Sequence, residues 1–476
     1  MDKTVFLTGA TGNMGWSGFQ ELLKTNHKIK ILVRPSRKNN KLLKSYKGNE
    51  KVEIIWGDLL NYADVLKGVE GSDYVLHVGG MVSPSADYFP EQTLKVNTTA
   101  AKNIVNAVLA QPNNEKIALV YIGSVAQYGD RLSPIHWGRT GDPVMASKYD
   151  KYAVSKCLAE KIIIDSGVKK WVSIRQTGML YAGIFKQINP TAFHVPIKGV
   201  LEWATVEDSG RLLANVCAES VPDEFWNRVY NLSSGEDYRL DNYDFETRLL
   251  APLGHSPKAL FEPHWFATKN FHGLWYTDAD ILENYLHFRE NLPVDEYFQR
   301  LQGQLPWYFS LAKFVPAIFI KLFLRKYAFE RGMGTQDWVK NNESKLNAYY
   351  GSLAEFNKIK AWDLPPKFEK NLDKAGKCGE IRTLEHGYDE SKSIYDLSLS
   401  EIQKAAEFRG GKFIGPVESL GEKGAIYEWE CEHGHRFSSS FEYVLLAGGW
   451  CVDCEVDKLL EAASERNNFV SQIIFL

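Results

Sequence analysis

The 476-residue sequence contains little cysteine and has no strong excess of charge of either sign. Six cysteines do not suggest a secreted disulfide scaffold, and three of them gather near the end of the chain. A net charge of −3 creates no overall field that would attract nucleic acid or an anionic membrane. No charged and apolar signal segment opens the chain, so we expect a cytoplasmic protein.

Long apolar runs are also scarce. The most apolar stretch, residues 305–323, contains Lys313, Pro316 and Lys321, which make it a poor transmembrane span. We expect an amphipathic helix packed on a neighbouring lobe, and peripheral docking on a membrane surface is the alternative. With 44% apolar residues, the chain can build a sizeable core in two or three domains.

A glycine-rich turn opens the sequence. The run from Thr4 to Thr8 is apolar and β-branched, as is typical of a strand buried on both faces. Gly9, Gly12 and Gly15 follow at the spacing of a dinucleotide-binding turn. Glycine there permits the tight bend, the approach of a pyrophosphate and close packing of the next helix, whose amides would face the phosphates.

The second predicted strand, residues 29–33, ends at a cation. An acidic side chain in this place would accept hydrogen bonds from the ribose hydroxyls of NAD, whereas Arg34 suits the 2′-phosphate of NADP. No Asp or Glu occurs between Glu21 and Glu50, so the sequence favours NADP, with NAD as the alternative. The predicted cofactor-binding residues are Gly9, Thr11, Gly12, Asn13, Met14, Gly15, Arg34, Asp58, Leu59, Val78, Gly79, Gly80, Tyr152, Lys156 and Thr177.

A serine, a tyrosine and a lysine form a candidate catalytic set. Ser124 follows an apolar strand pattern, and open α/β sheets bind ligands at the carboxyl ends of their strands. Tyr152 and Lys156 are one helical turn apart and project from one face. The ammonium, with a positive nicotinamide, would lower the pKa of the phenol from about 10 and let it act as general acid or base. Ser124 would hydrogen-bond the reacting oxygen.

With these motifs the chain resembles the extended short-chain dehydrogenase/reductases, the NAD(P)-dependent epimerase/dehydratase-like group, over roughly residues 1–300. Asn97 matches the family asparagine that supports the active site, and Val78-Gly79-Gly80 stands in place of a small-residue motif. The chain departs from the pattern at Gln176, where proline is usual, and at the glycine pair, where alanines are usual. The resemblance implies an α/β fold, a Rossmann doubly wound parallel sheet with a smaller substrate lobe.

The family contains reductases, dehydrogenases, epimerases and dehydratases, so the chemistry has to be argued separately. Val125-Ala126-Gln127 places no acid beside Ser124, which disfavours a sugar dehydratase. The stretch from His77 to Pro84 looks more like the flavonoid and hydroxysteroid reductase branches. The sequence favours an NADP-dependent oxidoreductase acting on a ketone or secondary alcohol of a small apolar substrate. The alternatives are an NAD-dependent epimerase or dehydratase acting on a nucleotide sugar, and a non-catalytic NADP-binding sensor or scaffold.

The last part of the chain carries a second pattern. A Cys-x-x-x-His pair and a Cys-x-x-Cys pair, separated by the length of a short β-hairpin, suit four-coordinate structural zinc. Cys431, His435, Cys451 and Cys454 would close the coordination shell, and His433 is the alternative ligand. The stretch resembles zinc-ribbon modules, and the acidic residues around it favour a structural or protein-contact role over nucleic-acid binding.

These patterns divide the chain into three predicted parts. Residues 1–300 form the dehydrogenase/reductase domain, 301–390 a helical extension and linker, and 391–476 a small zinc-binding module. The expected partner is a small-molecule substrate, with no nucleic acid, and a homodimer is left open.

Overall fold

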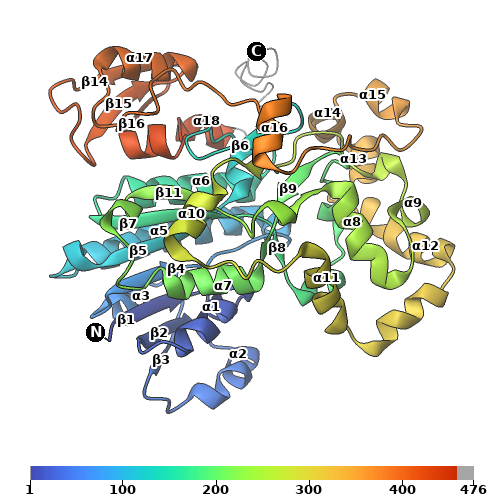
Figure 1. Cartoon of the computed structure of the whole chain (residues 1–476), viewed down its shortest axis with the longest axis horizontal. Coiled ribbons are helices and arrows are strands. Elements are labelled where there is room, and N and C mark those ends of the chain that lie inside the picture. The colour runs from blue at the N-terminus through green and yellow to red at the C-terminus, as the bar shows by residue number, and fades with distance from the viewer. Residues whose placement is uncertain (1, 458–476) are drawn as a thin grey trace.

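A seven-stranded parallel sheet lies at the centre of the molecule (Figure 1). The computed structural model describes residues 2–457, without the side chains of residues 310 and 457, so residues 458–476 of the predicted zinc module lie outside the described residues. The strand order β11-β7-β5-β4-β1-β2-β3 confirms the predicted doubly wound Rossmann sheet. Its strands are β1 (Thr4–Thr8), β2 (Lys28–Val33), β3 (Val52–Trp56), β4 (Tyr74–His77), β5 (Ala118–Ser124), β7 (Lys170–Gln176) and β11 (Arg228–Leu232).

Helices cover both faces of this sheet because its strands are apolar on both sides. Val5 and Leu7 of β1 belong to the core on one face, and Phe6 belongs to the core on the other. Helices α1 and α7 pack together on the first face, whereas α3, α5 and α6 form the layer on the second (Figure 1). The helices are α1 (Asn13–Leu23), α2 (Arg37–Leu42), α3 (Tyr62–Val69), α4 (Ser85–Tyr88), α5 (Pro90–Leu109), α6 (Lys151–Ile164) and α7 (Val206–Asn215).

A smaller lobe stands beside the sheet, on the right in Figure 1. Short strands pair there in two-stranded sheets, β8 with β10, β9 with β12 and β6 with β13. Side chains from α8 and α11 form the core of the lobe, where Trp203 stacks on Phe245 with 4.2 Å between ring centres. The elements are β6 (Trp137–Gly138), β8 (Met179–Leu180), β9 (Val200–Glu202), β10 (Ala204–Thr205), β12 (Arg239–Asp241), α8 (Asn242–Leu250), α9 (Pro257–Leu260), β13 (Trp275–Tyr276) and α11 (Val294–Gly303). Helix α10 (Ala279–Leu286) instead packs on β11 of the large sheet.

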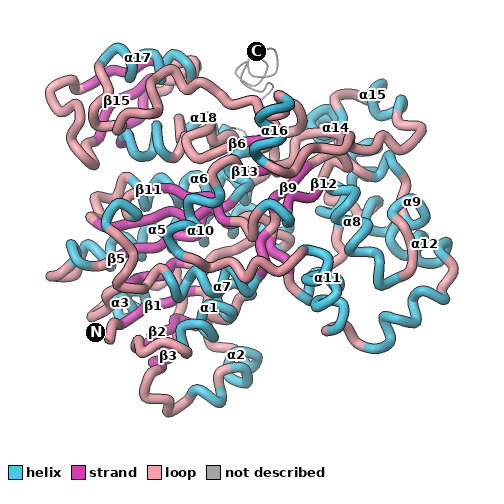
Figure 2. Tube along the Cα trace, viewed as in Figure 1, coloured by secondary structure: helices cyan, strands magenta, loops and turns pink. Residues whose placement is uncertain are grey.

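A loop-rich extension of short helices continues from the lobe (Figure 2). Leu324 and Ala328 of α12 join Phe193 and Phe261 in one core, so this helix packs on the lobe through its last turns. No single helix of the described chain is long and apolar enough to cross a membrane, whereas η10 and α12, bent by 112°, reach that length and composition together. The elements are η10 (Trp307–Phe314), α12 (Ala317–Ala328), α13 (Thr335–Asn341), α14 (Glu343–Tyr350), α15 (Leu353–Lys358) and α16 (Leu372–Cys378).

The segment between α16 and the last module is held against the Rossmann part. His386 is buried, and its Nε2 lies 3.0 Å from Oδ1 of Asp142. Arg139 donates hydrogen bonds to the carbonyl of Leu384 at 2.9 Å and to the carboxylate of Glu390 at 2.6 Å. These contacts fix the path of a segment whose composition alone is typical of a linker.

The last module is a three-stranded antiparallel sheet flanked by helices, at the upper left of Figure 1. Its aromatic residues Tyr427, Trp429 and Tyr443 share one apolar core with Ala159 and Ile163 of α6. The module is thus packed into the outer helical layer, and the three-part division of the chain stays a prediction. Its elements are α17 (Leu399–Phe408), β14 (Lys412–Gly415), β15 (Ile426–Glu430), β16 (Arg436–Ser440), η11 (Glu442–Leu446) and α18 (Val452–Asp457).

Candidate functional site

The turn between β1 and α1 leaves room for a ligand that approaches the main chain closely. Gly9 has a φ of +73°, and a Cβ added to it would lie 2.8 Å from the backbone of Gly79. A Cβ on Gly15 would lie 2.1 Å from the Gly9 carbonyl oxygen, so a side chain is excluded there. Gly12 caps α1 without a side-chain hydrogen bond, which leaves amides free for an anion. The turn therefore fits the phosphates of a dinucleotide.

Other predicted cofactor residues follow the carboxyl ends of neighbouring strands. Arg34 follows β2 directly and is exposed, and Asp58 follows β3, where its carboxylate accepts a hydrogen bond from the Leu60 amide at 2.9 Å. A Cβ on Gly79 would meet Leu59 at 2.8 Å, so the segments after β3 and β4 are in close contact. One edge of the sheet thus presents the glycine turn and the cation in the order that an adenosine phosphate requires.

The glycine pair after β4 has a steric cause. A Cβ on Gly80 would lie 2.9 Å from Oδ1 of Asn97 and 4.0 Å from Nζ of Lys156. Asn97 is buried and ties this loop to α6, because it accepts a hydrogen bond from the Met81 amide at 2.8 Å and donates to Oγ of Ser155 at 2.8 Å. Glycine at position 80 thus lets the asparagine hold the loop against the helix that carries the candidate tyrosine and lysine.

Ser124 and Tyr152 meet at the wall of one cavity of about 450 Å³, which Asn13 and Thr177 also line. Ser124 is the last residue of β5, and its hydroxyl accepts a hydrogen bond from the Ala126 amide at 3.2 Å. The structure therefore brings together residues that lie far apart in the sequence. Of the predicted cofactor and catalytic residues, those that line the cavity are Asn13, Ser124, Tyr152 and Thr177. Lys156 on α6 and Asn97 on α5 are not among the lining residues.

The pKa of Tyr152 depends on its burial and on its hydrogen bond with Ser124. Burial raises the pKa of Tyr152 to about 12, and a hydrogen bond with Ser124 acts in the opposite direction. Burial lowers the pKa of Lys156 to about 8, against the effect of Glu160, and its ammonium donates to the Ile122 carbonyl at 2.8 Å. Desolvation therefore dominates in the chain without a nicotinamide, and the lowering expected from the ammonium together with that positive ring stays a prediction. A phenol that stays protonated at neutral pH can donate to a carbonyl.

The rest of the cavity wall is mainly apolar. Phe185, Phe193 and Phe245 line it together with many aliphatic side chains. Neither Lys nor Arg occurs among the described residues that line it. A cavity of this size and character suits a largely apolar small molecule.

Glu246 is the functional candidate that sequence reasoning missed. It lies on α8, lines the apolar cavity and is only 4% exposed. Within the described chain its carboxyl group makes no hydrogen bond or ion pair, and burial raises its pKa to about 8. A buried carboxyl without a partner is costly, so it is suited to a polar group of a ligand. No motif in the sequence marks this position, since its role depends on the burial that the lobe creates.

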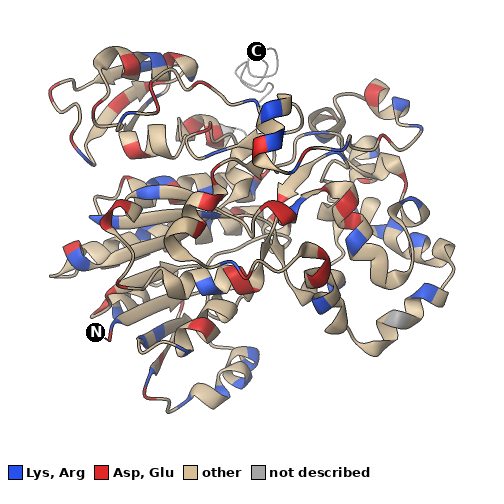
Figure 3. Ribbon diagram, in the orientation of Figure 1, with Lys and Arg blue, Asp and Glu red and all other residues tan. Residues whose placement is uncertain are grey.

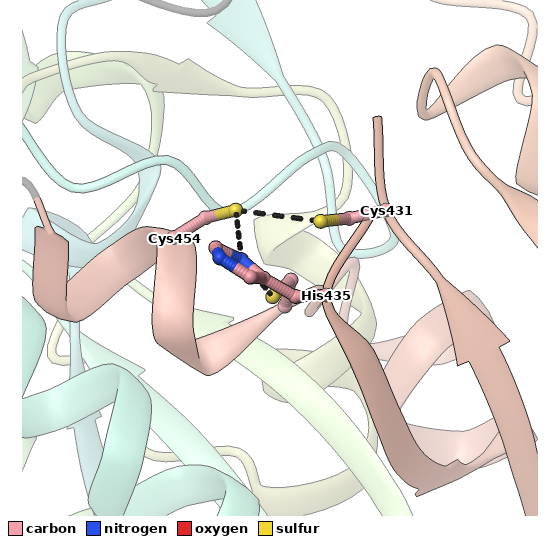
Figure 4. A group of neighbouring side chains, drawn as sticks. Cys431, His435 and Cys454 are labelled. Carbon is pink, nitrogen blue, oxygen red and sulfur yellow. Dashed lines mark hydrogen bonds between the residues drawn. The ribbon is translucent and has the colours of Figure 1, made fainter. Parts of the chain in front are cut away.

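The tail cluster has the geometry of a tetrahedral metal site. Cys431, His435, Cys451 and Cys454 each place one ligand atom within 4.8 Å of the others. Figure 4 shows Cys431, His435 and Cys454 pointing toward one another. The Sγ atoms of Cys431 and Cys454 are 3.6 Å apart, and Nδ1 of His435 lies 3.4 Å from the latter. Neighbouring ligands of tetrahedral zinc are about 3.5–3.8 Å apart by its bond lengths. Nδ1 of His433 lies 3.4 Å from Cys454, but this histidine is outside the group of four. Three sulfurs and one nitrogen fit zinc.

Two hydrogen bonds join the module to the loop before α6. The carbonyl oxygen of Gly448 accepts from the Val144 amide at 2.8 Å, and Glu455 accepts from the Ala146 amide at 3.1 Å. Gly448 itself has a φ of +68°, and a Cβ there would lie 2.0 Å from the Asp142 carbonyl oxygen. The segment around the metal site thus shapes the loop that leads to Tyr152.

Comparison with known proteins agrees with this arrangement. Residues 5–175 match the model of the NAD dependent epimerase/dehydratase family, and they include the glycine turn, Ser124, Tyr152 and Lys156. This part of the chain is therefore similar to that family. The match confirms the predicted resemblance and indicates an enzyme.

Curated relatives of the family domain include UDP-glucose 4-epimerases of Rickettsia akari and Rickettsia felis. Each is 27% identical over 128 residues, which are 26% of this chain and 36% of the relative, so the match spans about a third of those proteins.

Solved structures share the fold at low identity. UDP-glucose 4-epimerase from Bifidobacterium longum, solved with NAD+ and UDP, is 17% identical with a TM-score of 0.50, covering 65% of this chain and 99% of its own. The dTDP-glucose 4,6-dehydratase of Bacillus anthracis, solved with NAD, is 14% identical with a TM-score of 0.50, covering 64% and 96%. These likenesses concern the fold.

Glu246 should make the stability of the protein depend on pH. Its folded pKa of about 8 lies above its ordinary value of 4.5, so between these pH values the folded state keeps a proton that the unfolded state releases. The free energy of unfolding should therefore fall as the pH rises through this window, by up to about 1.4 kcal/mol per unit. Urea unfolding at pH 5, 6.5 and 8 measures this. Glu246→Gln should flatten the slope, whereas Glu418→Gln, at an exposed site, should keep it. Equal slopes for wild type and Glu246→Gln would disprove the assignment.

The tail cluster should hold about one zinc ion per chain. Metal analysis of protein purified with reductant and without chelator measures this. Cys454→Ser should lose most of the metal because it removes one of four ligands, whereas Cys378→Ser, at an exposed cysteine outside the cluster, should retain it. Metal-free wild-type protein would rule the site out.

Proposed function

We propose that this chain is an NADP-dependent oxidoreductase of the epimerase/dehydratase family that acts on a ketone or secondary alcohol of a largely apolar substrate. The observation that carries the proposal is the cavity, where Ser124 and Tyr152 face a mainly apolar wall without Lys or Arg among its described residues. A nucleotide sugar brings a pyrophosphate, which proteins usually neutralise with cations. An apolar ketone has no such need.

The residues of the chain divide the work as follows. The glycine turn and the N-terminus of α1 would hold the cofactor phosphates. A bound nicotinamide supplies or accepts the hydride. Tyr152 would give its phenolic proton to the carbonyl oxygen of the substrate, or take one from an alcohol, and Ser124 would hydrogen-bond the same oxygen. Glu246, protonated at neutral pH, would hydrogen-bond a second polar group of the substrate within the apolar wall.

The second candidate is an NAD-dependent epimerase acting on a nucleotide sugar. The names of the curated relatives favour it, as does the NAD found in related structures. Arg34 and a cavity wall without Lys or Arg among its described residues favour the first candidate.

Cofactor choice separates the two candidates. We expect NADPH to bind more tightly than NADH because a charged contact of Arg34 with the 2′-phosphate contributes roughly 1.5–3 kcal/mol, about 10–100-fold in Kd. Arg34→Asp should remove this preference, whereas Lys41→Asp, on the nearby α2, should preserve most of it. Titration of each cofactor measures both effects. Equal affinity of the wild-type protein for NADPH and NADH would disprove the NADP assignment.

Substrate class and the role of the tyrosine are tested together. Aromatic ketones should be offered with NADPH, hydroxysteroids with NADP+ and UDP-sugars with NAD+, and we expect turnover of the apolar ketones and alcohols. Tyr152→Phe keeps the ring but removes the proton, so turnover should fall about 10²–10⁴-fold while cofactor affinity changes little. Tyr181→Phe alters another phenol that lines the cavity and should retain turnover within a few fold. Epimerisation of UDP-sugars without ketone reduction would establish the second candidate instead.

A further inference from the structure

An apolar surface on the extension takes no part in the proposed chemistry. The docking patch, as we call residues 307–323 of η10 and α12, exposes Trp307 by 76%, Phe314 by 74% and Phe319 by 62%. Ile318, at 56%, adds to it. Contiguous apolar surfaces of this kind mark sites of interaction with a protein or a membrane.

The two faces of α12 have different roles. Leu324 and Ala328, near its end, are buried in the core of the lobe. Ile318, Phe319 and Leu322 instead project into solvent, so the first turns present an apolar side that nothing in the described chain covers. Twelve residues of helix span about 18 Å, less than the roughly 30 Å of a hydrocarbon core. Such a helix can lie in the plane of a membrane interface.

The charge of this region points to an anionic surface. Residues 305–329 contain Lys313, Lys321, Arg325 and Lys326 and no Asp or Glu, in a chain with a net charge of −3 (Figure 3). Nζ of Lys326 lies 3.9 Å from the ring centre of Phe323, so cations and aromatic rings are interleaved. Interfacial helices combine these residue types, with cations reaching the headgroups. A second copy of the chain would bring cations against cations, which disfavours self-association.

The docking patch is continuous with the substrate cavity. Phe309 of η10 lines that cavity beside Leu253, at the end of the short helix that packs against η10. Part of the cavity wall is therefore built by the segment that carries the exposed aromatic side chains.

We propose that residues 307–323 dock on the surface of an anionic lipid bilayer. Trp307, Phe314 and Phe319 enter the boundary between headgroups and acyl chains, and Lys313 and Lys326 contact the headgroups, whereas Lys321 pairs with Glu262 at 2.5 Å. Docking places one wall of the cavity at the membrane surface, where apolar small molecules accumulate. The exposure and the charge of the docking patch do not depend on the proposed reaction.

Flotation of the full-length protein with vesicles tests the proposal. We expect binding to phosphatidylcholine vesicles that contain 30 mol% phosphatidylserine, weaker binding without the anionic lipid, and weaker binding at high salt. Lys313→Glu/Lys326→Glu should lower partitioning about 25-fold or more, since each cation contributes about five-fold near an anionic surface. Trp307→Ser/Phe319→Ser should lower it about ten-fold or more. Leu353→Ser, at an apolar residue 52% exposed outside the patch, should leave it unchanged.

Two outcomes would overturn the proposal. The first is absence of vesicle binding by the wild-type protein, or binding that all the variants retain. The second is a dimer in sedimentation that Trp307→Ser abolishes, without vesicle binding, since the patch would then serve a second copy. NADPH affinity measured on the same variants should stay unchanged, so failure of docking is distinguishable from failure of the enzyme assignment.

Discussion

A buried ion pair between sheet and helix is the constraint on which the rest of the structure depends. Arg175 of β7 and Glu160 of α6 meet at 2.6 Å with both side chains fully buried. Glu160 also accepts a hydrogen bond from the side-chain amide of Gln127. The side-chain oxygen of Gln127 in turn accepts a hydrogen bond from the backbone amide of Ser124 at 2.8 Å. Arg175 in turn donates to the carbonyl of Ala447 in the last module at 2.6 Å. One charge pair therefore fixes α6, the end of β5 and the tail relative to one another, and loss of either charge would leave the other buried alone, at about 3–5 kcal/mol.

The sequence was sufficient wherever function rests on short-range pattern. Gly9 and Gly15 cannot carry side chains because backbone atoms lie within 3 Å of the position that a Cβ would take. The spacing of the glycines in the sequence predicts this requirement. The same holds for Tyr152 and Lys156, which one helix places on neighbouring turns. Two short motifs likewise predicted which tail side chains converge, and the structure groups His435 rather than His433 with the three cysteines.

The sequence was insufficient wherever a property arises from distant packing. Glu246 is buried because other parts of the lobe pack around α8. The residues next to it in the sequence do not predict this burial. The pKa of Tyr152 in the chain without a nicotinamide depends on packing for a related reason, because burial raises it and burial cannot be read from a four-residue spacing. The residues around His386 have a composition that is typical of a linker. In the structure, however, His386 hydrogen-bonds to Asp142, which lies 244 positions earlier in the sequence.

The contact between Arg175 and Ala447 also sets the order in which the protein can complete its fold during synthesis. The two residues are 272 positions apart, and at roughly 5–20 residues per second the ribosome needs on the order of tens of seconds to travel between them. Until the last module is made, α6 lacks the aromatic residues Tyr427, Trp429 and Tyr443 that share its core in the complete chain. The nascent Rossmann half thus emerges with an uncovered apolar helix face, and such a chain needs protection from aggregation until its last module arrives.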